Sequence, residues 1–109
     1  MLQIIKNRID KETLEKAAID LEGYIKVVID IEEEILSAGG TRHVDGEQLL
    51  LKEGSLQKNL WGGGFDLETG EIDFDSMINI RPNQNNTSRE VLDSQIRQKM
   101  QGIIEKLLK

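Results

Sequence analysis

The segment that most constrains the fold is residues 24–32, which read YIKVVIDIE. Every second residue from Ile25 to Ile31 is apolar and β-branched, so these side chains share one face of an extended chain. A second apolar run, residues 35–38, follows two glutamates and ends at two glycines. A period of two, a short turn and a returning apolar run predict a β-hairpin. The chain must therefore build a sheet.

The residues before this hairpin predict a strand and then a helix. Residues 2–6 form a short apolar strand candidate. Asp10 is placed to cap a helix, because its side chain can accept hydrogen bonds from the free N–H groups of a first turn. Ile9 and Leu14 have the spacing of a hydrophobic staple around that start. Gly23 suits the left-handed position that ends a helix.

The stretch HVDGEQLLLKEGS, residues 43–55, is ambiguous between helix and strand. Asp45 with Gln48 fits a capping box, and Gly54 fits a C-terminal cap, so a short helix is the first prediction. The three consecutive leucines would also suit a buried strand, because periodicity cannot separate the two at this length. Residues 45–53 therefore stay open between the two structures.

Residues 60–80, LWGGGFDLETGEIDFDSMINI, predict a second hairpin. A three-residue loop at 68–70, with Gly70 left-handed, would set Phe65 opposite Asp73. One face would then carry Leu60, Ile72, Phe74, Ile78 and Ile80, and the other Trp61, Phe65, Leu67, Met77, Asp73, Asp75 and Asn79. A bulge in the glycine run 62–64 would shift this register by one residue.

The last segment predicts a helix of about twenty residues that starts at Thr87. Thr87 and Glu90 fit a capping box. The helix would carry one apolar stripe of Leu92, Ile96, Met100, Ile103 and Leu107. The expected fold is a single α+β domain over residues 1–109, in the order β-α-β-β-α-β-β-α. Short hairpins between helices favour an antiparallel or mixed sheet with the helices on one face.

Composition narrows the classes of function. The 109 residues carry a net charge of −6 and no basic run, which argues against nucleic-acid binding. Without cysteine there is no disulfide framework, thiolate metal site or cysteine nucleophile. No segment approaches the roughly 20 apolar residues of a membrane span, and the start of the chain lacks the pattern of a signal peptide. We therefore predict a cytoplasmic protein without membrane or nucleic-acid partners.

The loop RPNQNNTSR, residues 81–89, is the predicted ligand site. It precedes the expected start of the last helix, where free N–H groups and the helix dipole favour an anion. The candidate ligand-binding residues are Arg81, Asn83, Asn85, Asn86, Thr87, Ser88 and Arg89, with Gln84 beside them. The competing interpretation is turn and cap chemistry, with Arg89 pairing to Asp93 one helical turn away.

Other polar patterns give weaker signals. His43, Asp45 and Glu47 have ligand chemistry, but there is no second histidine and no recognised ligand spacing, so we predict neither a metal site nor a cofactor. Asp73 and Asp75 alternate with Glu71 on one strand, a pattern typical of a solvated face. No serine lies in a nucleophile-elbow motif.

Two functions remain open from the sequence. The first is a small binding or interaction module that takes a small anionic ligand. The alternative is a small enzyme that uses Arg81, the asparagine cluster and either His43 or Asp75. Homodimerisation is expected as well, because a face carrying Trp61 and Phe65 needs cover.

The chain also resembles a family of short bacterial proteins of unknown function. Two stretches carry the resemblance, DIEEEILSAGGTRHVDGEQLLLKEGSLQKNLWG and FDSMINIRPNQNNTSREVLDSQIRQKM. It implies one compact cytoplasmic domain. It implies no catalytic residues, because the family has no assigned activity.

Overall fold

The computed structural model describes residues 1–109 and shows one five-stranded antiparallel sheet with three helices. The strands are β1 (Gln3–Ile5), β2 (Tyr24–Asp30), β3 (Ile35–Ala38), β4 (Leu60–Asp66) and β5 (Ile72–Asp73), and the helices are α1 (Lys11–Ala18), α2 (His43–Lys52) and α3 (Ser94–Leu108). The strands are ordered β1-β3-β2-β4-β5 across the sheet. The α+β class, the single domain and the order of elements are confirmed.

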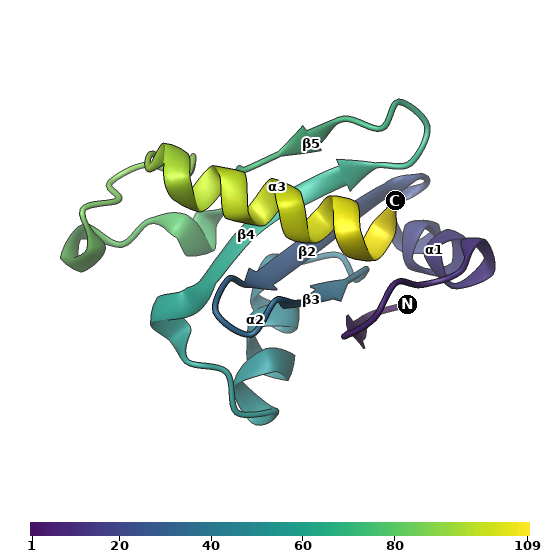
Figure 1. The fold of residues 1–109 in the computed structure, drawn as a ribbon, viewed down its shortest axis with the longest axis horizontal. Coiled ribbons are helices and arrows are strands. Elements are labelled where there is room, and N and C mark those ends of the chain that lie inside the picture. Colours follow the sequence, from purple (N-terminus) through teal and green to yellow (C-terminus); the bar gives the residue numbers. More distant parts are fainter.

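The helices cover both faces of the sheet, so the predicted one-sided arrangement is wrong. In Figure 1, α3 crosses the front of β2 and β4, and α2 lies behind the sheet. The main core joins α1 and α3 to the face of β2 that carries Ile25, Val27 and Ile29. Val28 points the other way and packs with Leu50 of α2 and with Leu60, so the second face has an apolar cluster of its own. A strand with an apolar residue on its alternate face needs cover on both sides.

The first two helices form where the sequence places them. Asp10 caps α1, as predicted, by accepting a hydrogen bond from the Thr13 N–H at 2.8 Å. Residues 45–53 are helical except at the C-terminal end, which resolves the ambiguity in favour of helix. The predicted cap of α2 is wrong, because the helix already starts at His43 and Asp45 pairs with Arg42 at 3.2 Å.

The β4–β5 hairpin is shifted by one residue from the main predicted register. The Asp66 N–H donates to Glu71 O at 2.9 Å, so the loop has four residues instead of three. Phe65 therefore faces Ile72. Trp61 and Phe65 are buried in the main core with Ile72 and Phe74 around them, which contradicts the predicted division of faces. Residues 77–79 form a 3-10 turn instead of strand, and Met77 is 63% exposed.

The last helix starts six residues later than predicted, with its N-cap at Asp93 instead of Thr87. Asp93 is its N-cap and accepts a hydrogen bond from the Gln95 N–H at 2.8 Å. The residues before it run beside the segment after β5, where the Val91 N–H donates to Phe74 O at 3.0 Å. Val91 is fully buried. Burial of Val91 and pairing to a distant segment outweigh the local capping-box signal at Thr87.

No helix is both long and apolar enough to cross a membrane.

Candidate functional site

The predicted site loop at 81–89 is held together by its own hydrogen bonds. Arg81 is buried, and its guanidinium lies over the ring of Trp61 at 4.5 Å from the centroid. Its acceptors are all within the chain: the carbonyls of Gln57 (2.8 Å), Leu60 and Ile78 (3.0 Å) and Gln84 Oε1 (3.2 Å). Burial lowers the pKa of Arg81, with the charge of Glu47 acting in the opposite direction. This arginine is a structural clamp with little donor capacity left for a ligand.

Two buried asparagines complete the internal network. The Asn86 amide group donates to the carbonyls of Asn79 and Glu90, and its oxygen accepts from the Leu92 N–H at 2.9 Å. Asn79 is fully buried, and its side-chain amide forms hydrogen bonds with β4. It accepts from the Gly62 N–H at 2.8 Å and donates to the carbonyls of Gly62, Phe74 and Arg89. No local sequence pattern marked Asn79 as a buried structural residue.

The remaining loop residues make few contacts. Asn83, Asn85 and Thr87 are exposed, and Asn85 has φ +59°, so it serves as the left-handed residue of a turn. The Ser88 hydroxyl accepts from the Glu90 N–H at 3.0 Å. Arg89 forms an ion pair at 3.0 Å with Asp75, which lies outside the loop, so the predicted helical pair with Asp93 does not form. The loop also ends without a helix start, which removes the feature that motivated an anion site there.

A cleft on the α2 side of the sheet gathers polar groups from distant parts of the chain. Its volume is about 430 Å³. We call it the α2 cleft; its polar residues are Tyr24, Lys26, Arg42, His43, Asp75 and Arg89. Val44, Met77 and Ile78 supply apolar walls, and Ser76 is the remaining lining residue. Strand β2, the start of α2 and the segment after β5 thus meet at one place.

His43 is the most distinctive group in the α2 cleft. Its Nε2 lies 2.7 Å from Gly63 O. Because a carbonyl can only accept, Nε2 carries the hydrogen and Nδ1 is left as an acceptor. Nδ1 has no partner in the chain and is not sealed from solvent. Burial lowers the pKa of His43, and the charge of Lys26 acts in the same direction, so the ring is neutral near pH 7.

The glycine run in β4 makes room for this arrangement. A Cβ on Gly62 would lie 2.6 Å from Ser76 Cβ, and one on Gly64 would lie 2.6 Å from Asp73 Oδ2. The space above Gly64 is filled by Tyr24, whose hydroxyl donates to Asp73 Oδ2 at 2.6 Å. Burial, and then this carboxylate, raise the pKa of Tyr24. The glycines are thus needed for close approach and have no left-handed backbone, and the predicted bulge does not occur.

Positive charge dominates the lining of the α2 cleft. Three cationic side chains face one carboxylate, in a chain whose net charge is −6. Arg89 is paired with Asp75, and Arg42 is paired with Asp45. Lys26 is half-buried and makes no ion pair. A cation held in a cleft without a counter-charge is a group that an anion can satisfy.

The start of α2 opens at the same place. No side chain caps it, and the N–H groups of His43 and Val44 find no acceptor in the chain. Free donors and the positive end of the helix dipole act in the same direction as the three cations. The α3 start differs, because the Asp93 carboxylate already occupies it.

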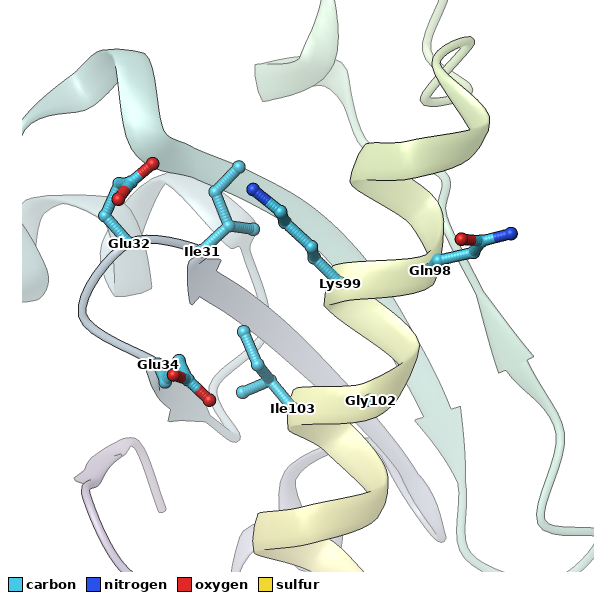
Figure 2. Close-up of a pocket in the computed structure, with 7 residues that line it drawn as sticks. All are labelled: Ile31, Glu32, Glu34, Gln98, Lys99, Gly102 and Ile103. Atoms are coloured by element: carbon cyan, nitrogen blue, oxygen red, sulfur yellow. The ribbon is translucent and has the colours of Figure 1, made fainter.

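A second hollow of about 530 Å³ lies between α3 and the β2–β3 turn. Figure 2 shows Lys99 and Ile103 pointing from α3 toward the turn, whereas Gln98 points away. Glu34 from the turn already pairs with Lys106 at 3.6 Å. Although it is the larger hollow, its lining has two glutamates for one lysine and contains no helix start, so it lacks the positive charge of the α2 cleft. The α2 cleft is therefore the better candidate site.

The residues predicted from the sequence are divided between the loop at 81–89 and the α2 cleft. His43, Asp75 and Arg89 line the α2 cleft, whereas Arg81 and the asparagines do not. The predicted alternative enzyme site is thus split, because its arginine is used inside the fold. No three His, Asp or Glu side chains lie close enough to hold a metal ion.

Three residues of the cleft were missed from the sequence: Tyr24, Lys26 and Arg42. Tyr24 and Lys26 are separated by two positions on β2, so a polar strand face was visible in the alternation. Nothing local indicated that α2 would start beside it.

Comparison with known proteins gives a family and no activity. No curated protein and no solved structure matches the chain significantly. The model of one family, described as a protein of unknown function, matches residues 3–107, which is nearly the whole chain. The chain therefore belongs to the DUF5674 family.

Proposed function

We propose that this protein binds a small organic anion, with a carboxylate or phosphate head and an apolar body, in the α2 cleft. One observation carries the proposal: Lys26, Arg42 and Arg89 converge with the uncapped start of α2 in an otherwise acidic molecule. Cytoplasmic location and homodimerisation belong to the same proposal. The original reason for a dimer is weaker, since Trp61 and Phe65 are buried within one chain.

The cleft also has the size and the walls for a small organic molecule. Its volume of about 430 Å³ falls within the roughly 300–1,000 Å³ of small-molecule sites. Met77 and Val44 are exposed apolar side chains beside the charged groups. An inorganic ion would leave them in water, whereas a short branched acid would cover them and gain from burial.

Calorimetry at low ionic strength tests this proposal. We expect 4-methylpentanoate to bind, and its neutral amide to bind far more weakly, because only the acid satisfies the cations. Lys26→Gln should weaken binding of the acid by about tenfold, the loss of one charge-assisted hydrogen bond.

Lys99→Gln is the matched control, because Lys99 lines the second hollow instead. It should bind the acid like the wild type. Equal binding of the acid and the amide, or equal losses in the two lysine variants, would overturn the proposal.

A further inference from the structure

We propose that His43 recognises a hydroxyl group on the bound ligand, so that the preferred ligand is a small apolar hydroxy acid. This inference rests on the proposed function of the α2 cleft. It is carried by the one acceptor nitrogen that the cleft leaves without a partner in the chain.

The ring of His43 is fixed in one orientation and one tautomer. Its Nε2–H is used by Gly63 O at 2.7 Å. A histidine whose second nitrogen is fixed in this way offers Nδ1 only as an acceptor. The other polar groups of the cleft are mostly donors: Lys26, Arg42, Arg89 and the first N–H groups of α2. An acceptor among donors is suited to a ligand that brings one donor of its own.

The charges around His43 favour a neutral donor over an ammonium group. Lys26 lies close enough to act on the ring, and Arg42 precedes it in the chain. Asp73 and Asp75 also act on the ring, but Asp73 accepts from Tyr24 at 2.6 Å and Asp75 pairs with Arg89. An α-ammonium group on the ligand would be repelled by the unpaired charge of Lys26. No carboxylate nearby is free to pair with it. A hydroxyl donates to Nδ1 without that repulsion.

Matched acids test the inference. We would measure the dissociation constants of 4-methylpentanoate, 2-hydroxy-4-methylpentanoate and leucine for the whole protein. The hydroxy acid should bind about 3- to 10-fold more tightly than the plain acid, the effect of one hydrogen bond. Leucine should bind most weakly of the three.

A variant then assigns the preference to the ring. His43→Phe keeps an aromatic ring without nitrogen, and it should lower the ratio between the hydroxy acid and the plain acid to about one. A role confined to packing would lower both affinities and leave the ratio unchanged. If this variant does not fold, the ¹⁵N signal of Nδ1 in the wild type should shift with the hydroxy acid and not with the plain acid.

The two proposals fail in different ways. Equal affinity for the hydroxy acid and the plain acid in the wild type would overturn the role of His43 and leave anion binding in place. Tightest binding of leucine would also overturn it. If none of the three acids binds, the proposed function itself fails.

Discussion

The loop at 81–89 and the α2 cleft contain similar groups but use them differently. In the loop, Arg81 and Asn86 direct their donors at carbonyls of the same chain. In the cleft, Lys26 and His43 Nδ1 keep capacity that the chain does not use. A high density of polar residues therefore does not identify a binding site by itself. Hydrogen-bonding capacity left over after folding is the better guide, because buried polar groups must find partners.

Removal of the Asn79 amide should have the largest effect. Asn79→Ala leaves the Gly62 N–H and Gly62 O without partners and removes one of two donors from the carbonyls of Phe74 and Arg89, so it should cost about 3 kcal/mol of unfolding free energy. Urea denaturation followed by circular dichroism measures the loss. Asn83→Ala is the control and should change stability by less than about 0.5 kcal/mol, since Asn83 is exposed. Equal effects of the two variants would contradict a structural role for the buried Asn79 amide.

Replacement of the clamp arginine should separate stability from binding. Arg81→Lys keeps the charge but loses the planar fork that reaches several carbonyls, so it should cost about 2 kcal/mol. Its affinity for 4-methylpentanoate should match that of the wild type. Lys26→Gln should behave in the opposite way, with normal stability and weaker binding. A large loss of affinity in folded Arg81→Lys would contradict the division of roles.

A substitution outside both regions should have a smaller effect of opposite sign. Gly102 lies inside α3, and an added Cβ there would meet no atom within 4 Å. Gly102→Ala should therefore raise the unfolding free energy by about 0.5–1 kcal/mol through helix propensity. Binding in the α2 cleft should not change. A lower unfolding free energy would show that the hollow of Figure 2, which Gly102 lines, does not accept an added methyl group.

The smallest expected effect is a pH dependence from His43. Its pKa is lowered in the folded state, mainly by burial, so the unfolded chain takes up a proton first as the pH falls below about 6.5. The contribution of His43 to the unfolding free energy should be constant above pH 6.5 and should decrease as the pH falls through the folded pKa of His43. Since His43 is the single histidine, one NMR signal reports its titration. A midpoint at or above 6.5 would contradict a buried, neutral ring.

Local signals predicted most of the fold, and long-range contacts decided what they missed. The Asp10 cap, the hairpin of β2 and β3 and the helix before Gly54 follow from patterns within a few residues. The start of α3 did not, because the pairing of Val91 to Phe74 spans a long loop and overrides the signal at Thr87.

The site was only partly predictable for the same reason. Each of His43, Asp75 and Arg89 was a candidate site residue, but they belonged to separate functional hypotheses. Their convergence depends on the start of α2 and the segment after β5 meeting beside β2. No local pattern shows which donors remain free once the fold has used the others.

Mapping of backbone amide shifts during a titration with 4-methylpentanoate shows which of the two regions binds the anion. The backbone amides of Lys26, His43 and Val44 should shift progressively, because these groups surround the proposed anion. The exposed residues Asn83, Asn85 and Thr87 should stay unchanged in the same spectra. Shifts confined to residues 83–88, or no shifts at millimolar acid, would contradict anion binding in the α2 cleft.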